Sequence, residues 1–402
     1  MNEAPEGGER WFLPGVRAIG AASLLSDLGH EVPTALLPSF LAKTLGLGVA
    51  RAAAALGLIE GFADGASGVA RFAGGPLADD PARRRATAVG GYTTTAVLSS
   101  LVGVTTAAWQ VGVLRSLAWA ARGVRGPSRN ALLADIAPPA AYGRAYGFER
   151  AMDNLGAIGG PLLAIGLVAL TSVRTAILVS VIPGALAAVA IVVAIRLAPK
   201  LAPRGHKPIT IQVRPVLRGR LGGLMFGITA FELGNVAATL LILRTTELVA
   251  PGHAYSRTAV LLYAGYNLAA TLIAIPAGHL IDRRGAAVVL VLAALFLTGG
   301  FAGFAFAGAG IPLLGALFVL AGLGIGVGET AESAAVAAFA PAEIRGSAFG
   351  LVAAVQAFAN LAASAVAGVL WRLVSPEAAF LYLAGWSILA AIAFAASMRA
   401  RG

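Results

Sequence analysis

Residues 122–161, RGVRGPSRNALLADIAPPAAYGRAYGFERAMDNLGAIGGP, lie between two apolar runs and nevertheless carry charged side chains along their length. Part of this segment returns later in the chain, because PPAAYGRAYGF at 138–148 is echoed by PAEIRGSAFGL at 341–351. The charged residues that matter below are Arg122, Arg125, Arg129, Glu149, Arg150 and Asp153. An internal duplication with charges inside hydrophobic segments is typical of a transporter.

The overall composition is that of a polytopic membrane protein. The 402 residues are 58% hydrophobic and only 12% charged, with a mean hydropathy of +0.82, whereas a soluble domain carries about 25% charged residues. The net charge is +11, but no basic stretch is interleaved with aromatic residues, so nucleic acid is not an expected partner. Cysteine is absent, which excludes disulfides and thiolate chemistry.

Twelve apolar segments are each long enough to span a bilayer, which takes about 20 residues. The sequence therefore predicts an all-α polytopic membrane protein with twelve transmembrane helices in two pseudo-symmetric six-helix bundles. The domains expected are a cytoplasmic tail at 1–13 without a signal peptide, a bundle at 14–196, a basic cytoplasmic linker at 197–220 and a bundle at 221–402. The expected spans are 14–42, 50–73, 86–108, 111–136, 144–170, 175–196, 221–245, 257–278, 286–308, 311–339, 346–371 and 377–397.

The basic residues of the loops predict the orientation. With both termini inside, the cytoplasmic loops hold 14 Lys and Arg residues and the outer loops hold six. Cytoplasmic loops of membrane proteins carry the excess of positive charge. We therefore expect a multi-pass protein of the plasma (inner) membrane, a monomer, with cytoplasmic N- and C-termini.

Further matches extend the duplication, and they carry a family resemblance. Asp27-Leu28-Gly29 matches Glu232-Leu233-Gly234, and GGPLADDPARRR at 74–85 matches GHLIDRRG at 278–285. These two loops resemble the two copies of the loop signature of the major facilitator superfamily, G-x-L-a-D-r-x-G-r-k. Each copy departs from the signature in places, with Asp80 and Ala82 in the first and Ala286-Ala287 in the second. The resemblance implies the twelve-helix transporter fold, with helices 1, 4, 7 and 10 lining a central cavity.

Two smaller motifs resemble those of proton-linked small-molecule and drug exporters within that superfamily. Arg122 with Gly126 is similar to the R-x-x-x-G motif of helix 4. Gly156-x-x-x-Gly160-Pro161 is similar to the helix-5 motif, although Ala164-Ile165 replace the glycine pair that normally follows. Taken without the resemblance, Gly156 and Gly160, like Gly61 and Gly65, indicate close helix packing.

Nine carboxylates are expected at membrane depth, and they are predicted to face the interior of the bundles. Each would cost roughly 2.5–3.5 kcal/mol at the centre of a helix facing lipid, and nine would exceed the stability margin of a fold. Helical spacing places Asp27, His30 and Glu31 on one face of the helix expected at 14–42. It places the arginines of 115–129 along one stripe of the helix expected at 111–136. The nine are Asp27, Glu31, Glu60, Asp64, Glu149, Asp153, Glu232, Glu329 and Glu332.

Depth along the helices, at 1.5 Å per residue, sorts these groups into two predicted sites. The proton-coupling or substrate site near the midplane comprises Asp27, His30, Glu31, Asp64, Arg122 and Glu232. The gating network on the cytoplasmic side comprises Asp79, Arg125, Arg129, Glu149, Asp153, Asp282, Glu329 and Glu332. Asp79 and Asp282 resemble the loop aspartates of the family, which brace the closed cytoplasmic gate by pairing with arginines or helix N-termini.

The favoured function is a proton-coupled exporter of a small, cationic or amphipathic molecule, working by alternating access. Its expected partners are that substrate, protons and the lipid bilayer, with no cofactor, and it is not expected to be an enzyme. Asp27, His30 and Glu31 are also metal-ligand types at i, i+3 and i+4, so a divalent-metal or siderophore permease is the alternative. A membrane enzyme or non-transporting receptor on the same fold is the alternative of another class.

Overall fold

A computed structural model describes residues 11–199, 210, 212–218, 221–236, 238–251 and 256–399, without the side chains of 50, 53 and 399. The described residues form helices and turns, with no strand among them. They group into two compact units, Met1–Ile211 with Ala342–Gly350, and Gln212–Pro341 with Leu351–Gly402. Much of the predicted tail at 1–13 and linker at 197–220 lies outside the described residues.

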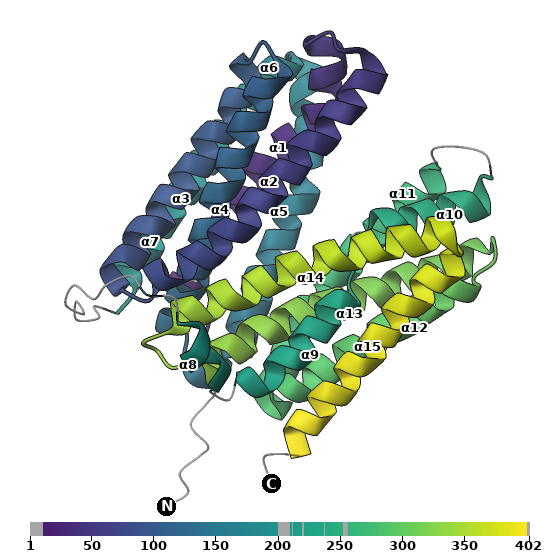
Figure 1. Cartoon of the computed structure of the whole chain (residues 1–402). Helices are drawn as coiled ribbons and strands as arrows, with labels where there is room; N and C mark the ends of the chain where they lie inside the picture. Colours follow the sequence, from purple (N-terminus) through teal and green to yellow (C-terminus); the bar gives the residue numbers. More distant parts are fainter. Residues whose placement is uncertain are drawn as a thin grey trace, which may run out of the picture. The chain divides into compact units, whose positions relative to one another are not determined.

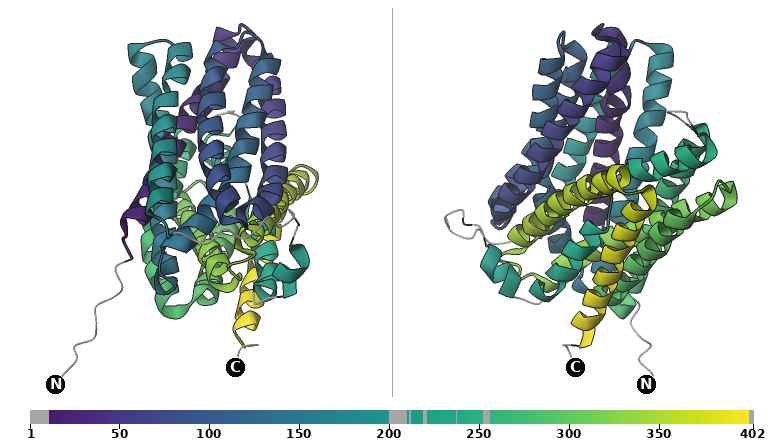
Figure 2. Two further views of the ribbon diagram at one scale, coloured as in Figure 1. Left: turned by 90° about the vertical axis from the view of Figure 1, so that its left-hand side faces the viewer. Right: turned by 45° about the vertical axis from the view of Figure 1, so that its right-hand side comes forward.

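The first unit contains the helices predicted for the N-terminal bundle (Figure 1). The long helices of this unit lie side by side in both views of Figure 2. The last predicted span is divided at Ser180 into two consecutive helices. The helices are α1 (Pro14–Ser39), extended by a π-helical turn (Phe40–Thr44), α2 (Gly48–Ala78), α3 (Pro81–Leu101), α4 (Ala108–Ile136), α5 (Tyr142–Leu170), α6 (Val173–Val179) and α7 (Val181–Leu197).

The second unit departs from the prediction at its first span. A continuous helix was expected over 221–245, but the chain leaves the helix at Gly234 and resumes it at Thr239. Gly234 packs so closely on another helix that a Cβ there would lie 2.6 Å from Ser387 Oγ. The helices are α8 (Val213–Arg218), α9 (Gly222–Leu233), α10 (Thr239–Val249), α11 (Arg257–Arg284), α12 (Ala286–Phe306), α13 (Ile311–Phe339), α14 (Arg345–Leu373) and α15 (Pro376–Arg399).

Seven helical segments of the described chain are long and apolar enough to cross a membrane, judged by length and composition. Helices α1 to α4 have 21 to 31 residues each and are also long enough, but they are not among the segments that are apolar enough by composition. In α4 the reason is four arginines within 29 residues. The seven segments are Pro139–Leu170, Val173–Leu197, Arg257–Arg284, Ala286–Phe306, Ile311–Phe339, Arg345–Leu373 and Pro376–Met398.

Close helix packing at glycines occurs within each unit at equivalent positions, which supports the duplication. A Cβ on Gly123 of α4 would meet the carbonyl of Ser67 on α2, and a Cβ on Gly326 of α13 would meet that of Ala270 on α11. Both members of the second pair lie 203 positions after their counterparts. Gly29 approaches Ser180 and Gly184 just as Gly234 approaches Leu383 and Ser387, so the alignment of Asp27 with Glu232 also follows from backbone packing.

One helix pair is packed differently in the two units. In the first, α5 lies tightly along α1, because Cβ atoms on Gly156 and Gly160 would lie 2.5 Å from Leu24 O and 2.3 Å from Glu31 Cβ. The positions 203 later are Ala359 and Ala363 on α14. Over the described part of the second unit, α14 makes no comparable contact with α9. The close packing predicted at Gly61 and Gly65 is not found within the first unit, since Cβ atoms there would meet none of its described residues within 4 Å.

Gly160→Ala is expected to lower the unfolding temperature of the detergent-solubilised protein, whereas Gly166→Ala on the same helix is expected not to lower it. The added methyl at 160 overlaps Glu31 Cβ, and overpacking of this kind costs about 1–3 kcal/mol. A methyl at the exposed position 166 meets nothing within 4 Å, and alanine favours the helix. Equal unfolding temperatures for the two variants would contradict the tight α1–α5 contact.

Candidate functional site

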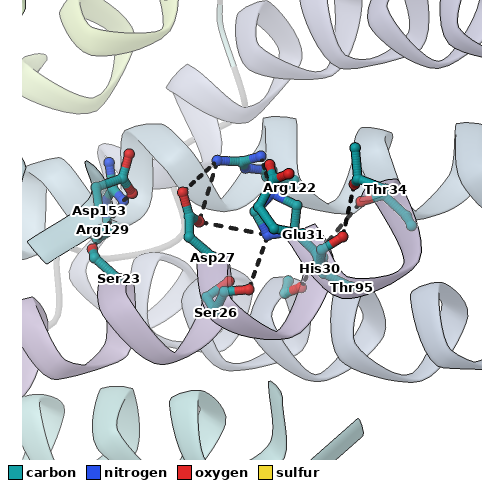
Figure 3. Close-up of polar contacts among 12 residues, drawn as sticks. Ser23, Ser26, Asp27, His30, Glu31, Thr34, Thr95, Arg122, Arg129 and Asp153 are labelled. Atoms are coloured by element: carbon teal, nitrogen blue, oxygen red, sulfur yellow. Dashed lines mark hydrogen bonds and ion pairs between the residues drawn. The ribbon is translucent and has the colours of Figure 1, made fainter. Parts of the chain in front are cut away.

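Asp27 and His30 of α1 meet Arg122 of α4 inside the first unit (Figure 3). Arg122 Nη2 donates to Asp27 Oδ2 at 3.1 Å and to Oδ1 at 3.3 Å, and Nη1 lies 2.6 Å from His30 Nε2. A guanidinium only donates, so Nε2 accepts, and the imidazole then donates from Nδ1 to the carbonyl of Ser26 at 2.9 Å. The hydrogen bonds therefore assign a neutral histidine that holds one end of the arginine.

Exposure differs sharply within this cluster. Asp27 and His30 are 3% and 2% exposed, whereas the side chain of Arg122 is 26% exposed. Glu31 lies beside His30, with Oε1 3.3 Å from Nε2. The buried carboxylate therefore depends for its counter-charge on a cation that a ligand can reach.

The same geometry bears on the alternative of a metal site at Asp27, His30 and Glu31. The lone pair of His30 Nε2, which a metal would need, already accepts from Arg122. Over the described residues, no group of three or more His, Cys, Asp and Glu side chains is placed to hold a metal ion. A divalent cation would also have to displace a guanidinium of like charge.

A second cluster on α2 and α4 includes residues that the sequence analysis did not select. The Arg115 guanidinium lies 3.5 Å from the ring centroid of Trp119 and forms an ion pair with Glu60 at 3.1 Å. The Trp119 indole N–H donates to Asp64 Oδ1 at 3.2 Å, and its ring meets His30 edge to face. Asp64 is thus joined to the Arg122 site through Trp119. The position of Trp119 between Arg115 and Arg122, at helical spacing, is the sequence signal that could have identified this tryptophan.

Arg129 joins two carboxylates of α5. Its Nη1 lies 2.7 Å from Glu149 Oε1 and 3.2 Å from Asp153 Oδ1, and it donates to Ser23 Oγ at 3.0 Å. Ser23 in turn donates to Glu149 at 2.6 Å, and Arg150 pairs with Asp153. The predicted grouping of Arg129, Glu149 and Asp153 is present in the structure, and Ser23 is an additional member.

Arg125 was predicted to belong with these residues, but it points elsewhere. Its guanidinium stacks 3.9 Å over the ring of Tyr92 on α3, and within the described residues its Nη1 has no hydrogen-bond partner. Three residues advance a helix by about 300°, so Arg125 is turned roughly 60° away from Arg122. That rotation directs it towards α3 instead of α5.

Asp79 is the C-cap residue of α2, and its carboxylate accepts two hydrogen bonds from the first turn of α14. Its carboxylate accepts the backbone N–H of Ser347 at 2.8 Å and also the Ser347 hydroxyl. Burial raises the pKa of Asp79, an effect that the bonds from Ser347 oppose. Nearby, Asp135 pairs with Arg84 and Arg345. The repeat segment 341–351, which matches 138–148, thus supplies donors to the first loop aspartate.

The remaining predicted site residues lie in the second unit. Glu232, on the last turn of α9, and Glu332 of α13 are 4% and 1% exposed. Their carboxyl groups lie within hydrogen-bonding reach of each other, so Glu332 faces an acid where an arginine-containing network was predicted. Glu329 is half-buried on α13, and Asp282 is half-buried in the last turn of α11.

Comparisons with known proteins give a consistent result. The family profile of the Major Facilitator Superfamily matches residues 19–248 and 224–401. An uncharacterised MFS-type transporter of Methanocaldococcus jannaschii is 27% identical over 379 residues, 93% of this chain and 92% of that protein.

Two solved structures are similar over nearly the whole chain. The human organic anion transporter MFSD10 (TETRAN) has a TM-score of 0.74 at 19% identity, covering 95% of this chain and 99% of that one. A bacterial homologue of the iron transporter ferroportin, in an outward-facing state, has a TM-score of 0.73 at 16% identity, covering 96% and 100%. At such identities the likeness shows the fold alone. Because the family profile covers all but the ends of the chain, the protein belongs to the major facilitator superfamily.

Proposed function

We propose that this transporter is a proton-coupled exporter of a small cationic or amphipathic molecule, working by alternating access. The observation that carries the proposal is the buried Asp27 carboxylate, whose counter-charge is the accessible Arg122 guanidinium. Burial favours the neutral carboxylic acid, and a nearby arginine favours the carboxylate. A change in the position of Arg122 therefore changes how tightly Asp27 holds a proton.

The chemistry at this site needs only a proton and a movement of one guanidinium. When Arg122 withdraws, Asp27 is left buried without a counter-charge and takes up a proton. When Arg122 returns, its two hydrogen bonds to the carboxylate favour release of that proton. His30 holds the other guanidinium nitrogen, so Arg122 has a fixed bound position to return to.

The resemblance of the helix-5 motif to that of exporters supports export over import. The excess of acidic residues at membrane depth supports a cationic substrate. Gly156 and Gly160 do bring α5 against α1 next to Asp27 and Glu31. The residues predicted at membrane depth comprise the nine acids listed above and six arginines, namely Arg71, Arg115, Arg122, Arg125, Arg129 and Arg150. An excess of acid favours protons and positively charged substrates.

The proposed localisation is the plasma (inner) membrane with both termini cytoplasmic, and it predicts a labelling pattern. Because the chain has no cysteine, single cysteines at Arg204 and Pro251 can be labelled without background. An impermeant thiol reagent added to intact cells should modify position 251 and spare position 204. The opposite pattern would reverse the orientation.

Transport in liposomes tests the proposed function directly. The protein is reconstituted with a pH-sensitive dye inside, and tetraphenylphosphonium, a permanently charged lipophilic cation, serves as the probe. We expect a pH gradient to drive tetraphenylphosphonium against its own gradient, together with opposite proton movement that the dye records. Protein-free liposomes and collapse of the gradient with nigericin are the controls. If a panel of organic cations, anions and neutral compounds gives no flux that depends on the pH gradient, proton coupling is wrong.

A further inference from the structure

The duplication aligns the Arg129 cluster of the first unit with a different set of residues in the second. Helices α4 and α13 each have 29 residues and begin at Ala108 and Ile311, 203 positions apart. Helices α5 and α14 also have 29 residues each and begin 203 positions apart. Arg129 therefore corresponds to Glu332, and Asp153 corresponds to Gln356.

The contact between these positions is retained, but the charges are exchanged. In the first unit Arg129 donates to Asp153 Oδ1 at 3.2 Å. In the second, Gln356 Nε2 donates to Glu332 Oε2. The acid now stands on the helix that carries arginine in the first unit, and its partner is a neutral amide. The geometry of the pair has been kept while its cation has been lost.

A second acid completes the arrangement. Glu232 corresponds to Asp27, because Gly234 and Gly29 make matching backbone contacts. Asp27 is paired with Arg122, whereas Glu232 accepts the amide of Asn235 at 3.0 Å and lies against the Glu332 carboxyl. Both glutamates are more than nine-tenths buried, and Oε1 of Glu332 has no hydrogen-bond donor among the described residues.

Among the described residues of the second unit, no basic side chain is placed to neutralise this pair. The helices of the second unit carry Lys or Arg only in their first and last turns, apart from Arg244. Arg244 instead donates hydrogen bonds to the Glu377 carboxylate at 2.6 Å and to the carbonyl of Ala305. The other groups around the glutamates are neutral or acidic, namely Asn235 just after α9, Tyr266 on α11, Glu329 on α13 and Gln356 on α14.

The end of α9 at Leu233 further disfavours a negative charge at Glu232. Glu232 is the penultimate residue of α9, which ends at Leu233. The C-terminus of a helix carries the negative end of its dipole. A second negative charge beside Glu232 is therefore repelled both by the Glu232 carboxylate and by the C-terminal end of α9. Two carboxylates at one buried site cannot both remain ionised without a cation.

We propose that Glu232 and Glu332 share one proton, and that this pair is a second proton-binding site separate from Asp27 and Arg122. One carboxyl donates its O–H to a carboxylate oxygen of the other, which satisfies the unpartnered acceptor. On release the proton passes to water that reaches the pair. The use of this proton in transport rests on the proposed function, and it would make two protons available per transport cycle.

Infrared difference spectroscopy on the purified full-length protein, in detergent and without substrate, tests the proposal. The C=O stretch of a protonated carboxyl should be present at neutral pH and disappear on alkalinisation. Glu332→Gln should abolish this band, because the new amide can donate to Glu232 and stabilise it as a carboxylate. Glu232→Gln should abolish the band equally, and serves if the first variant does not fold. Asp27→Asn, as the matched control, should keep it.

Two results would overturn the proposal: absence of the band from the wild type at neutral pH, or its persistence in either glutamine variant. Loss of the band in Asp27→Asn alone would assign the proton to Asp27 and equally reject the shared site. The measurement needs neither a gradient nor a substrate. If liposome transport fails while the band behaves as expected, the proposed function fails and the proton site stands.

Discussion

Asp27→Asn is expected to abolish transport driven by a pH gradient, while binding of tetraphenylphosphonium or exchange without a gradient is partly retained. Asparagine has the shape of a protonated aspartic acid, so the variant mimics the neutral state permanently. Arg122 then loses an ion pair of 3.1 Å but keeps its bond to His30. The variant should therefore fold and bind, yet be unable to exchange a proton at this position.

The measurement is uptake into liposomes with and without the pH gradient, beside Glu247→Gln. Glu247 is an exposed acid that accepts from Trp371, and its neutralisation should leave the driven rate unchanged. Glu232→Gln is expected to weaken binding of the probe while coupling through Asp27 persists, with fewer protons moved per transport cycle. Driven transport by Asp27→Asn at the wild-type rate would remove Asp27 from the mechanism and direct attention to Asp64 and Asp153.

Arg129→Ala is expected to produce the largest loss of stability. The change leaves Glu149 and Asp153 without their shared cation, although both are more than nine-tenths buried. Removing one partner of a buried ion pair costs about 3–5 kcal/mol in soluble proteins. Unfolding temperature in detergent is the readout, and the double variant Arg129→Ala with Glu149→Gln should recover part of the loss, because one stranded charge is then removed.

Arg85→Ala is the control for loss of a positive charge. Arg85 donates one hydrogen bond to the carbonyl of Pro199, and little change is expected on its removal. An Arg129→Ala protein with wild-type unfolding and transport would show that the cluster around Arg129 is dispensable. No recovery in the double variant would mean that lost packing, and not stranded charge, explains the effect.

Helical spacing and the cost of charge in lipid were enough to predict that Asp27, His30 and Arg122 lie together. Asp27 and His30 recur on one face of α1, and depth along the helix placed Arg122 opposite them. The interruption after Leu233 could not be predicted in this way, because the apolar run continues through 221–245 and a single glycine is compatible with a helix. Gly234 contacts Ser387, more than 150 positions away, but Gly29 makes the matching contact inside the unbroken α1, so this contact does not explain the interruption.

The partners of charged residues were predicted less well than their burial. Arg125 was grouped with its neighbours on α4, although a rotation of about 60° turns it onto Tyr92. Glu332 was grouped with Arg125 and Arg129 because it lies towards the cytoplasmic side of its helix, whereas its partners are Gln356 and Glu232. Opposite charges attract over several possible directions, so sequence spacing alone does not determine which pairs form.

The stacking of Arg115 on Trp119 gives the protein a built-in optical reporter. Trp119 is one of five tryptophans, and its indole N–H is bonded to Asp64 beside a guanidinium 3.5 Å from the ring centroid. Indole emission responds to nearby charges, so displacement of Arg115 or Arg122 changes the emission wavelength of this residue. Replacing the other four tryptophans with phenylalanine would leave a single tryptophan in contact with His30, and ligand arrival could then be followed in real time without a label.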